Sequence, residues 1–196
     1  MQLAPVTLAD AHVRLEPFNP AQYGAALRAM AEGAPEQFVL WSHRGPGDWI
    51  GLWLETIAAR TAAGTMIPFS VLSPDSADFL GITSYLDPNA VNRSVEIGMT
   101  VYAPKAVGTA INPAGKRLLL AHAFGEGAVR VQFQVDDRNK RSQAAVLKLG
   151  AKREGILRNH RTLPDGFVRD TAFFSIIDTE WPDVKARLDS RLAAFG

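Results

Sequence analysis

Two hydrophobic periods alternate along this chain and predict a mixed α+β protein. Residues 13–17 alternate apolar and charged side chains, which is typical of a half-buried strand. Residues 181–192 place apolar side chains three and four positions apart, which is typical of one helix face. The same criteria predict about seven strands, at 13–17, 66–72, 79–86, 95–101, 129–135, 156–163 and 167–177. They also predict helices at about 20–32, 48–63, 139–149 and 179–195, a helix that ends near Gly125, and an irregular segment over 38–47.

Turn residues mark where several of these elements end. Asp165-Gly166 lies between two runs rich in apolar and β-branched residues, which is the strongest short-range signal for a β-hairpin. Gly150 follows the helix over 139–149 and can end it in a left-handed conformation. The strands over 66–72, 79–86 and 95–101 are predicted to form a meander, and a βαβα unit is predicted in the second half of the chain.

The composition limits the number of domains, the kinds of binding partner and the kinds of chemistry that the protein can use. Its 196 residues are enough for one substantial core, and we expect a single domain over residues 1–196. A net charge of +1 gives no field for general nucleic-acid binding or an anionic membrane surface. The absence of cysteine excludes disulfides and a thiol nucleophile.

No apolar run reaches the roughly 18 residues of a membrane span, and the residues before the first strand do not show a basic flank followed by an apolar run. We therefore expect a cytoplasmic protein without membrane contact. The histidines show no short metal-ligand spacing, so no metal site is expected; they are His12, His43, His122 and His160.

The segment over 94–124 joins a predicted strand to a predicted helix through a loop poor in charged side chains. Such a junction aims free backbone N–H groups and the positive end of the helix dipole at one point, which favours an anion. An ordinary βα connection without a ligand is the alternative. The loop letters alone do not separate the two interpretations.

Five segments over residues 94–183 together resemble the GCN5-related N-acetyltransferases (GNAT), in the branch similar to the ribosomal-protein alanine acetyltransferases (RimJ/RimL-like). They are VEIGMTVYAP, VGTAIN, KRLLLAHAF, VDDRNKRSQAAVLKLGAKREG and LPDGFVRDTAFFSIIDTEWP. The resemblance implies a GNAT-type fold, with a central, mostly antiparallel mixed sheet that splits in a V and is flanked by helices. It also implies acetyl-CoA as the co-substrate and an amine as the acceptor.

By this resemblance, the loop before the predicted helix holds the pyrophosphate of acetyl-CoA. The register that matches the family's spacing comprises Val107, Gly108, Thr109, Ala110 and Asn112. A shifted register, Lys105-x-x-Gly108-x-Ala110, matches the family's residue types better and the preceding spacing worse. If Asn112 caps the helix, Pro113 loses nothing by lacking an N–H, and the helix begins one turn later than usual. The pantetheine arm is expected to pair with backbone near Val101.

Two side chains are expected to carry the chemistry. Glu96 resembles the glutamate of the family's EIG element and is our candidate general base; the alternative is a structural ion pair with Arg93 or another cation. Asn139 and Ser142 resemble the residues that contact pantetheine, and Ser142 can protonate the leaving thiolate. The alternative is that Asn139 is only an N-cap and Ser142 a solvated serine.

The acceptor is expected to meet Trp41, in the irregular segment, and His160, in the hairpin. A basic cluster surrounds that hairpin, and it either docks an acidic substrate surface or consists of solvated strand ends; its members are Arg158, His160, Arg161 and Arg169. The predicted activity is transfer of acetyl to a primary amine by direct attack in a ternary complex. The acceptor is a protein N-terminus or a small-molecule amine, a non-catalytic acyl-CoA-binding module is the rival, and a monomer or homodimer is expected.

Overall fold

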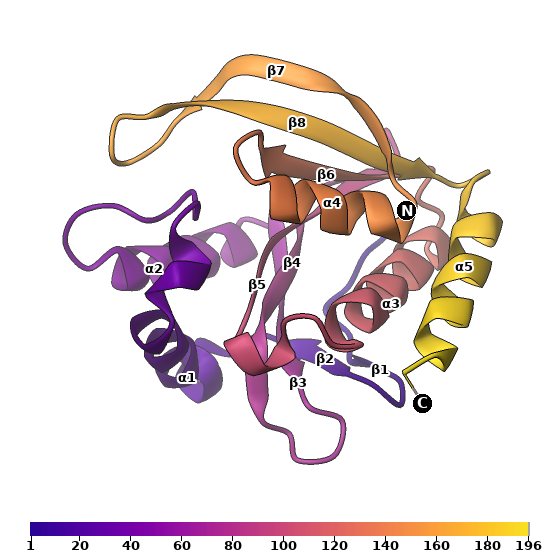
Figure 1. Cartoon of the computed structure of the whole chain (residues 1–196), viewed down its shortest axis with the longest axis horizontal. Helices are drawn as coiled ribbons and strands as arrows, with labels where there is room; N and C mark the ends of the chain where they lie inside the picture. Colours follow the sequence, from indigo (N-terminus) through magenta and orange to yellow (C-terminus); the bar gives the residue numbers. More distant parts are fainter. Residues whose placement is uncertain (196) are drawn as a thin grey trace.

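One mixed eight-stranded sheet runs through the computed structural model, which describes residues 1–195 (Figure 1). Its strands are β1 (Leu8–Ala9), β2 (Arg14–Pro17), β3 (Met66–Leu72), β4 (Phe79–Asn89), β5 (Ser94–Tyr102), β6 (Arg130–Asp136), β7 (Lys152–Thr162) and β8 (Val168–Ile177). Their order across the sheet is β1-β2-β3-β4-β5-β6-β8-β7. Among these strands, only β5 and β6 pair in parallel.

Helices cover both faces of the sheet and bury two hydrophobic clusters against it. They are α1 (Pro20–Gly33), α2 (Trp49–Ala62), α3 (Ile111–Gly125), α4 (Lys140–Leu149) and α5 (Trp181–Ala193), and a short 3₁₀ helix follows α1 at Pro35–Phe38. Helices α3, α4 and α5 share one cluster with the sheet, and α1 and α2 share the other. Within residues 1–195, no helix is both long and apolar enough to span a membrane.

The predicted elements are present, with differences at their ends. The eighth strand is the two-residue β1, which is too short to leave a period in the sequence. Strand β7 begins at Lys152 and not at 156, because the preceding residues also pair with β8. Asn19 and Asp48 cap α1 and α2 as predicted, and Gly150 ends α4 with a φ of 103°.

The two parallel strands separate soon after they meet. Only Ser94–Glu96 of β5 pair with Arg130–Gln132 of β6, and the strands then diverge in the V-shaped split that was expected (Figure 1). On its other side β5 carries a bulge, where the register with β4 shifts between Ile82 and Ser84. Met99 has a φ of 45° there, which is unusual for a residue with a side chain.

Candidate active site

The loop between β5 and α3 presents free backbone donors. Gly108 has a φ of 81°, a conformation that a side chain disfavours. Ala110 directly precedes α3 and offers no side-chain cap. Within residues 1–195, the backbone N–H groups of Gly108, Thr109 and Ala110 donate no hydrogen bond. These groups and the helix dipole together make a site suited to an anion.

Asn112 does not cap α3, so the expectation that the helix begins a turn later is wrong. The helix already begins at Ile111, whose N–H donates to the Thr109 hydroxyl at 3.3 Å. The Asn112 side-chain oxygen instead accepts a hydrogen bond from the Tyr102 hydroxyl at 3.2 Å. The Asn112 side chain therefore ties the helix to the end of β5, and the donors ahead of α3 stay free.

Beyond Glu96, the edge of β5 that faces β6 has no strand partner in residues 1–195. A peptide-like ligand can pair with such an edge. Val101 lies on this stretch and is buried, and its carbonyl oxygen faces Gly81 of β4, where a Cβ would collide with it. Gly81 thus lets β4 follow β5 closely through the bulge, while the opposite edge of β5 stays open.

Helix α4 begins at the end of β6, across the split from β5 (Figure 1). Asn139 caps it, with its side-chain oxygen accepting the Ser142 N–H at 3.0 Å. Within residues 1–195, the Ser142 hydroxyl makes no hydrogen bond. The Asn139 amide nitrogen and the Ser142 hydroxyl are therefore both available to a ligand.

Glu96 is a buried carboxyl group at the point where the split opens. Its side chain belongs to a residue that is only 6% exposed and that lies opposite Gln132 of β6. Burial raises the pKa of Glu96 from 4.5 to about 7, against the opposing effect of nearby cations such as Arg161 and Arg169. Within residues 1–195, Glu96 has no ion pair, so the alternative pairing with Arg93 is not formed.

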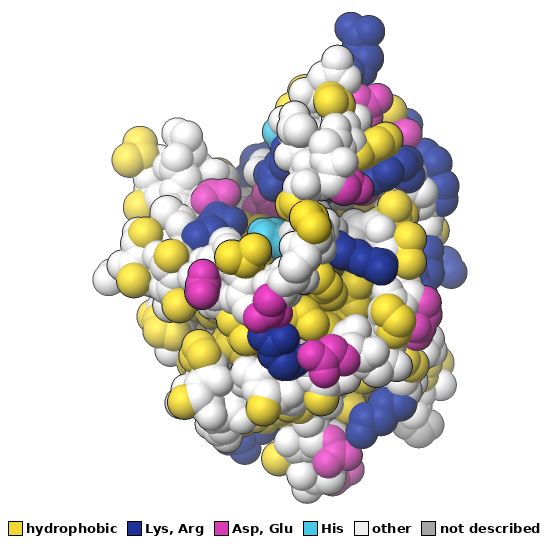
Figure 2. Space-filling model, turned by 90° about the vertical axis from the view of Figure 1, so that its left-hand side faces the viewer, with side chains coloured by type: hydrophobic (Ala, Val, Ile, Leu, Met, Phe, Trp, Pro, Cys, Tyr) yellow, Lys and Arg dark blue, Asp and Glu magenta, His cyan; other side chains and the backbone are white. Residues whose placement is uncertain are grey.

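A hollow lies beneath the β7–β8 hairpin on the side covered by α1 and α2. Figure 2 shows it with hydrophobic side chains in its floor, a histidine within it, and Lys or Arg side chains at its rim. Trp41 lines a pocket of about 320 Å³ between the segment that follows the 3₁₀ helix and the tip of the β7–β8 hairpin, together with Arg44 and Arg138. The Trp41 indole nitrogen and the His160 Nδ1 atom are both buried without a hydrogen-bond partner among the described residues.

The family profile described as "Acetyltransferase (GNAT) domain" matches residues 12–152. The chain belongs to the GNAT acetyltransferase family. A T. thermophilus protein described as an acetyltransferase is 36% identical, with a TM-score of 0.83 over 98% of this chain and 100% of that chain. A GCN5-related N-acetyltransferase from Brucella melitensis is 26% identical, with a TM-score of 0.87 over 97% of this chain and 86% of the other.

Mycobacterium smegmatis RimJ, solved in complex with CoA-disulfide, has the same fold as this GNAT domain. It is 23% identical, with a TM-score of 0.81 over 95% of each chain. No curated protein matches the sequence significantly. GNAT acetyltransferases use acetyl-CoA, and the free donors ahead of α3, the open β5 edge and the available groups on α4 fit an anionic, peptide-like co-substrate.

Two polar residues of this GNAT domain were missed by the sequence analysis. His43 lies in the irregular segment, and burial, with a smaller effect of Arg60 and Arg161, lowers its pKa to about 4. Nothing in the sequence around His43 indicates its burial. Lys116 is 5% exposed, and it could have been found, because it shares a helical stripe with Leu119, Leu120 and Ala123.

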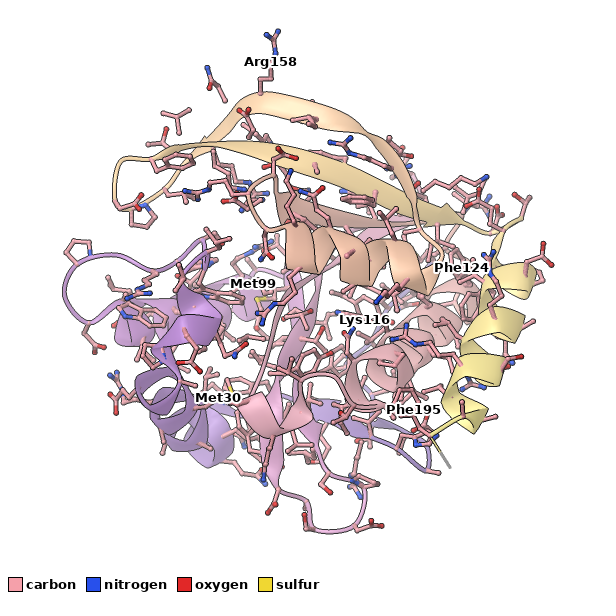
Figure 3. All side chains as sticks on the ribbon, in the orientation of Figure 1. Met30, Met99, Lys116, Phe124, Arg158 and Phe195 are labelled. Carbon is pink, nitrogen blue, oxygen red and sulfur yellow. The ribbon has the colours of Figure 1, made fainter. Side chains whose placement is uncertain are left out.

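Lys116 reaches from α3 to the strands beside the bulge at Met99 (Figure 3). Its ammonium nitrogen donates to the hydroxyls of Thr83 at 3.0 Å and Thr100 at 2.6 Å. The two hydroxyls are also 2.8 Å apart. The three side chains therefore connect α3, β4 and β5 behind the bulge.

Lys116→Met is expected to raise the melting temperature at pH 7. Burial lowers the pKa of Lys116 from 10.5 to about 7, so the unfolded chain binds a proton that the folded chain releases between these values. The free energy of unfolding of the wild type therefore rises with pH across this window, and the advantage of the variant shrinks by up to about 1.4 kcal/mol per pH unit. Thermal melts from pH 7 to 10 measure the difference in stability between Lys116→Met and the wild type, and a substitution of an exposed lysine, Lys148→Met, is the control. An advantage that stays constant with pH contradicts the expectation.

Proposed function

We propose that this protein transfers acetyl from acetyl-CoA to a primary amine by direct attack in a ternary complex. The observation that carries the proposal is one continuous arrangement. Free N–H groups lie between the end of β5 and α3, the β5 edge toward β6 is unpaired beyond Glu96, and the buried Glu96 carboxyl lies where that pairing ends. An anion site, an open strand edge and a base are the parts that such a transfer needs.

The backbone donors of Gly108, Thr109 and Ala110 hold the pyrophosphate in this proposal. The positive φ of Gly108 and the place of Ala110 directly ahead of α3 favour the register Lys105-x-x-Gly108-x-Ala110. Val107 supplies no charge to it and is 44% exposed. The β5 edge near Val101 and the side chain of Asn139 position the pantetheine arm.

Bound acetyl-CoA supplies the acetyl group as an activated thioester. The amine nitrogen bonds to the acetyl carbon as the carbon–sulfur bond breaks, and Glu96 accepts the proton that the amine loses. The Ser142 hydroxyl donates a proton to the departing thiolate and regains one from solvent water, and the proton on Glu96 leaves to solvent. Trp41 and His160 lie along the acceptor side, where they exclude water and orient the amine.

An α-amine suits this site better than a lysine. Holding a lysine with a pKa near 10.4 neutral at pH 7 costs roughly 4.6 kcal/mol, whereas an α-amine near 8 costs roughly 1.4 kcal/mol. A single carboxylate with a pKa of about 7 can overcome the smaller cost more easily. We therefore favour an α-amine acceptor, on a protein N-terminus or on a small molecule.

Two measurements test the proposed function. Acetyl-CoA is expected to raise the melting temperature, because it binds only the folded protein. Acetylation should then be detected by mass spectrometry in a panel of Ala- and Ser-initiated peptides, amino acids, polyamines and aminoglycosides. Binding without transfer to any amine favours a non-catalytic acyl-CoA-binding module, and absence of binding contradicts the proposal.

Ser142→Ala is expected to lower kcat by about tenfold or more while the Kd for acetyl-CoA changes little. The Ser142 backbone N–H still donates to Asn139 in this variant, so the helix cap is retained. Steady-state kinetics and calorimetry measure the two quantities. An equal loss of kcat and of acetyl-CoA affinity means that Ser142 only binds and does not protonate the thiolate.

A further inference from the structure

Two arginines face each other across the β7–β8 hairpin without a carboxylate partner. Arg161 of β7 is the register partner of Arg169 of β8. Within residues 1–195, neither guanidinium has an acidic group within 4.0 Å. Asp136 of β6 and Glu96 of β5 act on Arg169 only at longer range, and both oxygens of Asp136 are engaged by Arg138. Two cations placed side by side repel unless an anion lies between them or nearby.

Arg169 is the more unusual of the two, because it is only 6% exposed. Its Nε atom donates to the Thr171 hydroxyl at 3.0 Å, and within residues 1–195 its two terminal nitrogens have no acceptor. A guanidinium carries five N–H donors, so a ligand with two acceptor oxygens can bind the terminal nitrogens that no described residue engages. The charge of Arg169 still reaches Glu96, whose pKa it lowers.

Arg161 lies beside Arg169, on the other strand of the hairpin. One of its terminal nitrogens donates to the Gln134 side chain of β6 at 2.8 Å. Gln134 lies two residues beyond Gln132, the partner of Glu96, so all of these side chains occupy one face of the sheet. From strand spacing and rise, the Cα atoms of Glu96 and Gln134 lie at least about 8 Å apart.

A bulge in β7 brings a further polar group to this face. Leu157 and Arg161 are four residues apart in β7, whereas their partners in β8, Thr171 and Arg169, are only two residues apart. Within this bulge Asn159 adopts a φ of 50°. His160 is thereby turned against the ring of Phe173, with ring centroids 5.5 Å apart, and its Nδ1 atom is buried without a partner in the described residues. Bulges beside active sites commonly redirect side chains in this way.

We propose that Arg161 and Arg169 bind a carboxylate of the acceptor, so that the substrate is a primary amine with a carboxylate a few bonds from its nitrogen. The guanidinium fork matches the two oxygens of a carboxylate, and Glu96 is left to receive the amine proton. The carboxylate comes either from a free amino acid or from an acidic residue near a peptide N-terminus. This inference rests on the proposed function.

Matched acceptors that differ in this charge, with kcat/KM referred to the neutral amine of each, test the inference. One pair is a peptide that begins Ala-Asp and its Ala-Asn twin, and the other is an amino acid and its carboxamide. The value of kcat/KM should be about 10- to 100-fold higher for the charged member of at least one pair, and that pair identifies the source of the carboxylate. Arg161→Gln should bring that ratio close to one.

Arg158→Gln is the matched control. Arg158 lies on the same strand, and its side chain points away from the body of the molecule (Figure 3), so the ratio should match the wild type. Arg161→Gln also raises the pKa of Glu96, but this affects both members of a pair and cancels in their ratio. If the wild type acetylates both members of each pair equally, or if Arg161→Gln keeps the preference, the inference is overturned. If the wild type acetylates no amine, the proposed function is overturned and this inference with it.

Discussion

Glu96→Gln is expected to lower kcat for acetyl transfer by about 10²- to 10⁴-fold at pH 8 while the Kd for acetyl-CoA stays within about twofold. The amide keeps the shape of the side chain but cannot accept a proton from the amine. The effect should fall on kcat, because Glu96 lies where β5 stops pairing with β6, whereas the free donors ahead of α3 lie beyond the other end of β5. Steady-state kinetics with a saturating amine and calorimetry with acetyl-CoA measure the two quantities.

The same substitution is not expected to weaken the fold. The pKa of Glu96 is raised in the folded protein, so the unfolded chain loses this proton near pH 4.5 and the folded protein only near pH 7. The free energy of unfolding therefore falls as pH rises through this window, and at pH 8 the folded protein holds a buried charge. The neutral amide removes that charge, so the variant should melt at or above the wild-type temperature. A lower melting temperature together with lost activity would point to a structural role.

Ala110→Asp is expected to weaken acetyl-CoA binding at least about 30-fold and to leave the fold as stable as before or more stable. A carboxylate at the start of α3 interacts favourably with the helix dipole and with N–H groups that are otherwise free, typically by about 0.3 to 1 kcal/mol. The same negative charge occupies the position proposed for the pyrophosphate and repels it. The affinity for acetyl-CoA should therefore fall, while the melting temperature should stay the same or rise.

Ala110→Asn separates charge from size in this experiment. Asparagine has nearly the same volume as aspartate and can also accept hydrogen bonds from free N–H groups, but it carries no charge. It should weaken acetyl-CoA binding far less than Ala110→Asp, and the difference between the variants should shrink as salt is added. Equal affinities of the two variants, or an unchanged affinity of Ala110→Asp, would place the pyrophosphate elsewhere.

Most of the fold followed from local signals in the sequence. Asn19, Asp48 and Gly150 act where their chemistry predicted, because caps and left-handed stops depend only on nearby backbone groups. The β7–β8 hairpin formed around Asp165-Gly166 for the same reason. Strand β1 was missed because it is two residues long and owes its existence to pairing with β2. The split between β5 and β6 was expected only through the family resemblance.

The site was predictable in part, and the limits have physical causes. Glu96, Asn139 and Ser142 could be chosen by their resemblance to family residues, and the structure places them around the split. Asn112 was misjudged as a cap, because the sequence does not show that Tyr102 takes up its side chain. The lack of an ion pair at Arg169 among the described residues is a tertiary property, since Asp136 lies on a neighbouring strand but is already bound to Arg138. The spacing of residues along the sequence does not show which carboxylate pairs with which arginine.

The pH dependence of kcat/KM, measured for the wild type and Glu96→Gln with the same α-amine acceptor, tests the proposed role of Glu96 most directly. For the wild type, activity should fall as pH drops through about 7, where Glu96 takes up its proton, in addition to the fall caused by protonation of the amine itself. For the variant, kcat/KM should fall only over the pH range in which the amine takes up its proton, and it should be much lower than that of the wild type. Two results would contradict Glu96 as the base. One is a wild-type kcat/KM that falls only with protonation of the amine, and the other is a variant whose kcat/KM still also falls near pH 7.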